Sequence, residues 1–140
     1  MTQATANKPK LIIVGNGMAA GRMVDELLAP ANNFEITVIG DEPQGSYNRI
    51  MLSPVLAGET TAKAIVQKDS AWYEAQKIRF MAGVRVLRID KERKQVHCST
   101  GEQLSYDHVI IATGSRPARI PAENQDIAGV MEFRTLDDVD

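Results

Sequence analysis

Three small residues near the start of the chain have the spacing of a phosphate-binding turn. They are Gly15, Gly17 and Ala20, and they follow the apolar run Leu11–Val14. Gly15 allows a tight turn, Gly17 lets a phosphate approach the backbone, and Ala20 lets a helix pack closely against the strand. The free N–H groups at the start of that helix would donate to a pyrophosphate. The pattern therefore predicts a dinucleotide-binding site.

Two acidic residues stand where such a site needs a partner for the adenosine ribose. Glu35–Ile39 is rich in β-branched residues and predicts a second strand, and Asp41 and Glu42 follow Gly40 at its end. The distance from the glycine turn is about the 20 residues expected for the ribose-binding acid. Gly40 occupies the tip of the strand, where the simplest pattern has the acid. We expect Glu42 to bind the ribose, with Asp41 as the second choice; the alternative is a solvated turn acid.

Two later segments carry further candidate contacts to a dinucleotide. Arg49 follows the second strand, and its planar guanidinium could pair with pyrophosphate oxygens. Thr113 and Gly114 follow the apolar strand predicted over Val109–Ala112, and ligands of open α/β sheets lie beyond the carboxyl ends of strands. The alternatives are a surface arginine and an ordinary turn. We assign no residue as a catalytic acid, base or nucleophile.

The elements that must position these residues alternate between strand and helix. Met18–Leu28 has an apolar stripe of helical period, so the first strand, this helix and the second strand predict a right-handed βαβ unit. We therefore expect an α/β fold, a Rossmann-like FAD-binding domain with a parallel sheet, a crossover helix and an antiparallel β-meander. The other predicted strands are Ile78–Met81, Val84–Asp90, Gln95–Ser99, Gln103–Tyr106 and Val109–Ala112.

Shorter helices are predicted elsewhere. Ser53 is expected to cap a helix with Pro54 at its first position, and Ser70 or Asp69 is expected to cap a helix over Ser70–Lys77. Pro30 and the following asparagines should end the first helix. Residues 135–140 resemble the first turn of another helix.

Composition excludes several classes of function. The 140 residues are 44% hydrophobic and 24% charged with a net charge of −2, so neither nucleic acid nor an acidic membrane is expected as a partner. One cysteine, Cys98, cannot close a disulfide within the chain, and His97 and His108 add no metal-binding spacing. We expect a cytoplasmic protein without a metal site, with a flexible tail over residues 1–7 and a domain over residues 8–140.

The motifs together resemble the two-dinucleotide-binding-domain flavoproteins of the pyridine nucleotide-disulfide oxidoreductase-like superfamily. The resemblance covers about residues 8–140 and rests on the glycine turn at Gly15, the meander at about 84–106 and the sequence Ala112-Thr113-Gly114. In that family the first βαβ unit binds the ADP half of FAD, and the meander replaces a crossover helix. The resemblance implies FAD as the cofactor.

Four short segments carry a finer resemblance: Gly-Asn-Gly-Met at 15–18, Tyr-Asn-Arg at 47–49, Leu-Ser-Pro-Val-Leu-Ala-Gly-Glu at 52–59 and Phe-Arg-Thr-Leu-Asp-Asp at 133–138. They are similar to the N-terminal FAD region of NAD(P)H-dependent nitrite reductase large subunits. Rubredoxin and ferredoxin reductases have a similar motif, Tyr-x-Arg-Pro-Pro-Leu-Ser-Lys. The chain keeps its Tyr47, Arg49, Leu52 and Ser53, but Pro54 stands where those proteins have a lysine. Residues 45–58 contain no cysteine, which argues against a disulfide reductase.

This resemblance implies electron flow from NAD(P)H through FAD to an iron–sulfur and sirohaem centre. The NAD(P)H site, the cluster, the sirohaem and the contact with the electron acceptor would lie in regions beyond residue 140, so we expect the 140 residues alone to be inactive. A homo-oligomer or a small-subunit partner is expected. The alternatives are a rubredoxin- or ferredoxin-reductase-like flavoprotein and a non-catalytic nucleotide-binding fragment.

Overall fold

A four-stranded parallel sheet forms the centre of the computed structural model, which describes residues 8–29, 33–119 and 121–139. The strand order is β5-β2-β1-β9, and every neighbouring pair is parallel. The bounds of these strands are Lys10–Val14 for β1, Glu35–Gly40 for β2, Arg79–Ala82 for β5 and His108–Ile111 for β9. The predicted α/β, Rossmann-like fold with its parallel sheet is confirmed.

Residues 11–14 of the central strand β1 are all apolar because both faces of the sheet are covered there. Leu11 and Ile13 belong to one buried cluster, and Ile12 and Val14 belong to another on the opposite face. All four side chains are buried, as a strand whose residues alternate between two covered faces requires.

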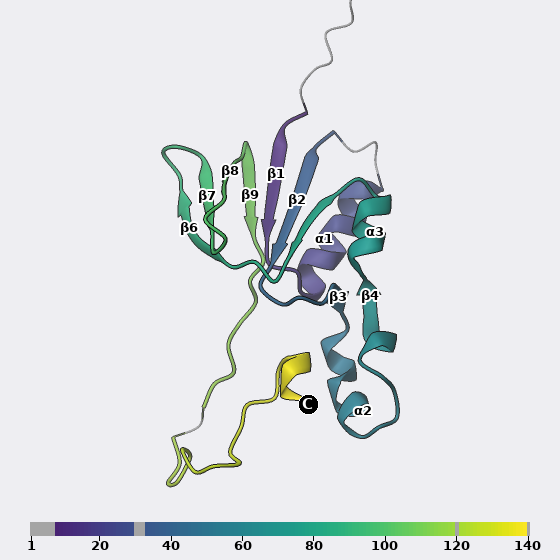
Figure 1. The fold of residues 1–140 in the computed structure, drawn as a ribbon, viewed down its shortest axis with the longest axis vertical. Coiled ribbons are helices and arrows are strands. Elements are labelled where there is room, and N and C mark those ends of the chain that lie inside the picture. Colours follow the sequence, from purple (N-terminus) through teal and green to yellow (C-terminus); the bar gives the residue numbers. More distant parts are fainter. Residues whose placement is uncertain (1–7, 30–32, 120, 140) are drawn as a thin grey trace, which may run out of the picture.

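Helices cover one face of the sheet, and the meander covers the other (Figure 1). α1 (Met18–Leu28) and α3 (Ser70–Ala75) contribute Val24 and Tyr73 to the first cluster. The antiparallel meander contributes Val96 to the second cluster. Its strands are β6 (Val86–Asp90), β7 (Gln95–Cys98) and β8 (Gln103–Ser105), in the order β6-β7-β8.

A smaller lobe lies beyond the end of the sheet and was only partly anticipated. Two short antiparallel strands, β3 (Ser46–Tyr47) and β4 (Val66–Lys68), form an unpredicted pair. Between them the chain forms a 3₁₀ turn (Arg49–Met51), α2 (Leu52–Leu56) and a second 3₁₀ turn (Lys63–Ile65).

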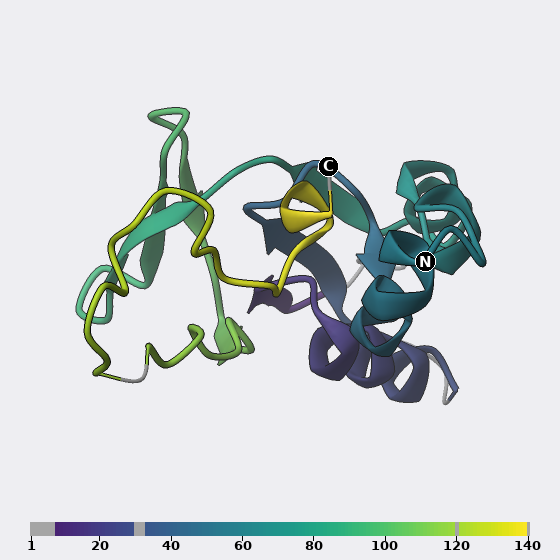
Figure 2. The same cartoon turned by 90° about the horizontal axis from the view of Figure 1, so that it is seen from below.

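The end of the chain returns to this lobe. After β9 the chain runs outward through a long loop and comes back as a 3₁₀ turn (Leu136–Asp138), seen in yellow in Figures 1 and 2. Leu136 is buried there with Tyr47, Leu52 and Ile65. Residues far apart in the sequence therefore share one small core.

The start of α2 differs from the prediction. The helix begins at Leu52 with Met51 in the capping position, so Ser53 lies inside the first turn rather than capping it. The preceding 3₁₀ turn is capped instead by the side chain of Asn48, which accepts a hydrogen bond from the Ile50 N–H at 3.1 Å. Because one turn leads directly into the next, α2 needs no side-chain cap of its own.

Other boundaries match the prediction more closely. α1 has the predicted bounds, and Asp69 caps α3 by accepting a 2.8 Å hydrogen bond from the Trp72 N–H. The predicted tail at residues 1–7 and the predicted helix stop at Pro30 lie outside the described residues.

Candidate functional site

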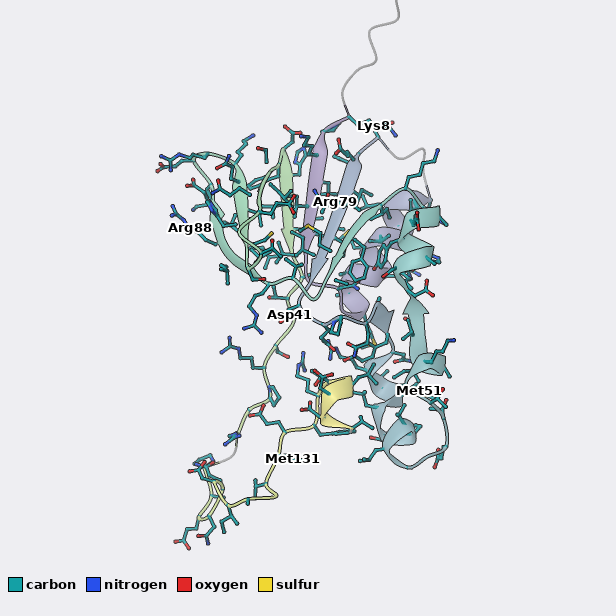
Figure 3. All side chains as sticks on the ribbon, in the orientation of Figure 1. Lys8, Asp41, Met51, Arg79, Arg88 and Met131 are labelled. Atoms are coloured by element: carbon teal, nitrogen blue, oxygen red, sulfur yellow. The ribbon has the colours of Figure 1, made fainter. Side chains whose placement is uncertain are left out.

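A cleft of about 680 Å³ opens at the carboxyl ends of β1, β2 and β9. In Figure 3 the label Asp41 marks this end of the sheet, above the small lobe that carries Met51. This is the edge at which open α/β sheets bind ligands. The predicted site residues that line the cleft are Gly15, Gly17, Asp41, Glu42, Arg49, Thr113 and Gly114.

Gly15 is a glycine because the fold leaves no room for a side chain there. Its φ is +109°, and a Cβ would lie 2.3 Å from the carbonyl oxygen of Ala112. The Gly15 N–H donates a 2.7 Å hydrogen bond to the Ile39 carbonyl. The turn thus passes between the ends of three adjacent strands, which fixes its backbone against the sheet.

The packing of the protein itself does not require a glycine at residue 17. It stands before α1 with φ −79° and ψ −173°, a conformation open to any residue, and a Cβ there would meet no atom within 4 Å. The space beside its backbone belongs to the cleft. A phosphate group could occupy that space and accept hydrogen bonds from the N–H groups of the first helical turn.

Ala20 does not line the cleft. Its side chain is fully buried in the cluster that joins α1 to β1, together with Leu11 and Val24. Its contribution to the site is therefore the close approach of the helix to the sheet, which brings the start of α1 to the cleft.

Glu42 and Arg49 form an ion pair in the wall of the cleft. One carboxylate oxygen of Glu42 accepts from the Arg49 guanidinium, and the other accepts from the Tyr47 hydroxyl at 2.5 Å. The Arg49 guanidinium also donates 2.8 Å hydrogen bonds to the Tyr47 oxygen and to the carbonyl of Arg134. Burial, and then the hydrogen bond to Glu42, raise the pKa of Tyr47 far above its usual value, so its hydroxyl stays protonated.

Asp41 pairs with a different residue, and both side chains are exposed to solvent. Its carboxylate lies 3.1 Å from the guanidinium of Arg85, and the two side chains are 53% and 66% exposed. An ion pair this exposed is strongly screened by solvent and contributes little to stability.

Arg134 is a cleft residue that the sequence interpretation missed. Its guanidinium lies 3.2 Å from the position of a Cβ at Gly114, whose φ is +74°. Among the described residues, no side-chain hydrogen bond or ion pair of Arg134 is found. No local pattern indicates this cation, because Arg134 reaches the cleft only after the long loop that follows β9 has returned. Figure 2 shows the course of that loop. Arg85, Arg116 and Asn16 also line the cleft and were not predicted.

The described part of the chain has neither a candidate metal cluster nor a helix that could span a membrane. Within residues 8–29, 33–119 and 121–139, no three His, Cys, Asp or Glu side chains gather as metal ligands. The helices in that part of the chain are all too short or too polar to cross a membrane. His97 and Cys98 point to opposite faces of β7, and burial raises the pKa of the Cys98 thiol.

Known proteins resemble the chain over almost its full length. It is 42% identical over 134 residues to the nitrite reductase [NAD(P)H] of Bacillus subtilis, which covers 95% of the chain and 17% of that protein. It is 34% identical to the nitrite reductase (NADH) large subunit of Escherichia coli, over 95% of the chain and 16% of the relative. The chain thus spans about a sixth of these relatives, and the resemblance inferred from the sequence motifs is confirmed.

Solved structures share the fold. The putidaredoxin reductase in a covalent complex with putidaredoxin is 31% identical with a TM-score of 0.80, over 94% of the chain and 32% of that structure. A ferredoxin reductase from Rhodopseudomonas palustris is 25% identical with a TM-score of 0.85, over 95% and 33%. Residues 9–140 also match the pattern of the pyridine nucleotide-disulphide oxidoreductases. The chain belongs to the pyridine nucleotide-disulphide oxidoreductase family.

Proposed function

We propose that the cleft binds FAD and that residues 8–140 are part of the FAD-binding domain of an NAD(P)H-dependent oxidoreductase. The observation that carries the proposal is the open space at Gly17, which adjoins a helix N-terminus in a cleft of about 680 Å³. The backbone of this turn is held against the strands, and the space beside it belongs to the cleft. A turn of this kind can bind a pyrophosphate.

The acids in the cleft suit the adenosine ribose. Glu42 is our first choice for the ribose and Asp41 the second. Each carboxylate oxygen can accept more than one hydrogen bond, so the contacts of Glu42 to Arg49 and Tyr47 leave acceptor capacity for ribose hydroxyls.

Arg49 suits the pyrophosphate in the same way. A guanidinium has five N–H donors, and the observed bonds to Tyr47, Glu42 and the Arg134 carbonyl use three of them. The remaining donors can serve a phosphate oxygen. Thr113 and Gly114, beyond β9, would lie on the flavin side.

When bound, FAD would accept a hydride from NAD(P)H and release electrons singly to an acceptor. The chain's own residues would bind and orient it. By similarity to the Bacillus subtilis and Escherichia coli nitrite reductases, we propose that the full-length protein is a nitrite reductase large subunit. The NAD(P)H site, an iron–sulfur cluster and a sirohaem would then lie in other regions of that protein, and residues 1–140 alone would be inactive.

A ferredoxin-reductase-like protein is the second candidate. The observation in its favour is 34% identity, over 91% of the chain and 31% of the relative, to the ferredoxin–NAD(+) reductase component of a biphenyl dioxygenase system from Paraburkholderia xenovorans. Pro54, which stands at the position of a lysine in the resembling motif, weighs against it. A third possibility is a non-catalytic nucleotide-binding module.

The test is to purify the full-length polypeptide encoded by the gene and to measure its flavin content and its electron acceptor. We expect a yellow protein that releases FAD on denaturation and oxidises NADH or NADPH with nitrite as the acceptor. Turnover with a ferredoxin but not with nitrite would favour the second candidate. A colourless protein that takes up no FAD would contradict the proposal and favour the third.

A further inference from the structure

We propose that Tyr73 of α3 is a positioning residue for the FAD-binding turn and that it acts through Asn16. The inference rests on the proposed function of the cleft and adds to it a residue that lies outside the cleft. Asn16 stands between Gly15 and Gly17 and lines the cleft, whereas Tyr73 is fully buried behind it.

One side-chain hydrogen bond joins the glycine turn to α3. The Tyr73 hydroxyl donates to the Asn16 side-chain oxygen at 2.5 Å, across 57 positions of sequence. The other amide atom of Asn16, Nδ2, is buried and has no hydrogen-bond partner within the described residues. Within the described residues, the Tyr73 hydroxyl is therefore the hydrogen-bond partner that holds the Asn16 side chain.

Tyr73 is held firmly enough to act as an anchor. Its ring lies 4.6 Å from the ring of Phe80 and meets the ring of Trp72 edge-on at 5.2 Å. Burial raises the pKa of Tyr73 to about 12, so the hydroxyl remains a donor in mildly alkaline as well as neutral solution. A rigid aromatic ring with a fixed donor can hold a flexible amide in a single orientation.

Gly40 makes the arrangement possible. A Cβ at residue 40 would lie 2.8 Å from the Cβ of Asn16 and 3.7 Å from the ring of Phe80. A larger residue at the end of β2 would thus push Asn16 away from its hydrogen bond. This accounts for the glycine at the tip of the strand, where the simplest dinucleotide pattern has the ribose-binding acid.

The consequence is a turn that is held in place on both sides. The Gly15 N–H ties it to β2, and the Asn16 side chain ties it to α3. Binding to a turn already in its bound shape loses less conformational entropy than binding to a mobile one. Removing the Tyr73 hydroxyl should therefore weaken FAD binding although Tyr73 contributes no atom to the cleft.

The experiment compares Tyr73→Phe with the unsubstituted full-length protein. The apoprotein is titrated with FAD, at a temperature where circular dichroism shows both forms folded. Because a single hydrogen bond is lost and the ring packing is kept, we expect the dissociation constant to rise about 3- to 10-fold. The matched control is Tyr106→Phe, which removes another buried hydroxyl, 3.4 Å from the Asp90 carbonyl and outside the cleft. It should change the constant by less than about twofold.

A double-mutant cycle tests the route through Asn16. Asn16→Ala should weaken FAD binding, and adding Tyr73→Phe to it should have no further effect. Additive effects would overturn the inference, as would equal FAD affinity of Tyr73→Phe and the unsubstituted protein, or equal weakening by Tyr106→Phe. A full-length protein that takes up no FAD would instead contradict the proposed function, so the two failures are distinguishable.

Discussion

The guanidinium of Arg49 donates a 2.8 Å hydrogen bond to the backbone carbonyl of Arg134, 85 positions further along the chain. The bond holds the returning segment against the small lobe, where Leu136 is buried beside Tyr47. Asp138 closes the following turn by accepting hydrogen bonds from the N–H groups of Arg134 and Thr135 at 2.8 and 2.7 Å. These contacts keep the Arg134 side chain at the cleft.

The two glycines of the turn should respond in opposite ways to substitution. Gly17→Val should leave the fold intact, because a side chain there meets open space, and should sharply weaken FAD binding by filling the place of the pyrophosphate. Gly15→Val should instead destabilise the fold, because its Cβ would overlap the Ala112 carbonyl. Thermal unfolding and FAD titration of the two full-length variants separate the effects. Unchanged FAD affinity in Gly17→Val would contradict the assignment of the turn.

Arg49→Ala should weaken FAD binding by roughly 10- to 100-fold. The substitution removes a charged donor from the cleft and also leaves Glu42 and Tyr47 without their shared partner. Arg49→Lys should bind FAD little better than Arg49→Ala, because an ammonium group cannot form the same planar set of hydrogen bonds. Arg22→Ala is the control, since Arg22 pairs with Glu26 on the exposed face of α1. An FAD titration that is unchanged by Arg49→Ala would make Arg49 a structural residue only.

Arg134→Ala tests the cation that local sequence does not reveal. Its guanidinium lies at the cleft near Gly114, where it can meet an anionic part of the cofactor, so we expect FAD affinity to fall by about tenfold. Arg119→Ala is matched in charge but lies on the exposed loop, where Arg119 pairs with Glu132. FAD affinities measured at two salt concentrations should show a weaker salt dependence for Arg134→Ala alone. Equal behaviour of the two variants would remove Arg134 from the site.

Asp90 should make the stability of the meander depend on pH. Its side chain is 6% exposed. The Arg93 N–H, which donates to the carboxylate at 2.9 Å, and the nearby Arg93 and Arg88 guanidinium groups hold the pKa of Asp90 below its usual value. A pKa lowered by folding stabilises the protein above the unfolded pKa of about 4, and the stabilisation is lost as the pH falls toward the folded pKa.

Asp90→Asn should therefore lower the free energy of unfolding most at neutral pH and least in acid. Urea unfolding of the 140-residue chain, followed by the fluorescence of its single tryptophan, Trp72, measures this difference at several pH values. Glu92→Gln removes the same charge from an exposed neighbour and should change little. A deficit of Asp90→Asn that is constant with pH would contradict the assigned role.

Local pattern predicted the elements of the sheet because their signals are local. The apolar run of β1, the stripe of α1 and the turn spacing of the meander each lie within a short window of sequence. The β3–β4 pair gave no such signal, since two- and three-residue strands have no periodicity to detect. A serine before a proline is a common helix start and predicts a cap at Ser53. The continuous turn from Asn48 into α2 instead places Ser53 inside the helix.

Some residues of the candidate site could be predicted from local sequence, and others could not. Gly15 and Gly17 could be found from spacing alone, because the turn and the first helix are continuous in sequence. The ion pair between Glu42 and Arg49 could not, since it depends on how the small lobe folds back beside the end of β2. Arg134 reaches the cleft, and Tyr73 reaches Asn16 behind it, only through tertiary structure, and no local pattern assigns either residue to the site.

The strand β9 lies at an edge of the parallel sheet. β9 pairs with β1 on one side, and within the described residues no strand pairs with its other side. Ile111, the last residue of β9, is 66% exposed. Peptide groups along such a margin can recruit a foreign strand. In the laboratory, a preparation of residues 1–140 alone should therefore become turbid as it is concentrated, and a longer polypeptide whose own backbone covers this margin should stay clear.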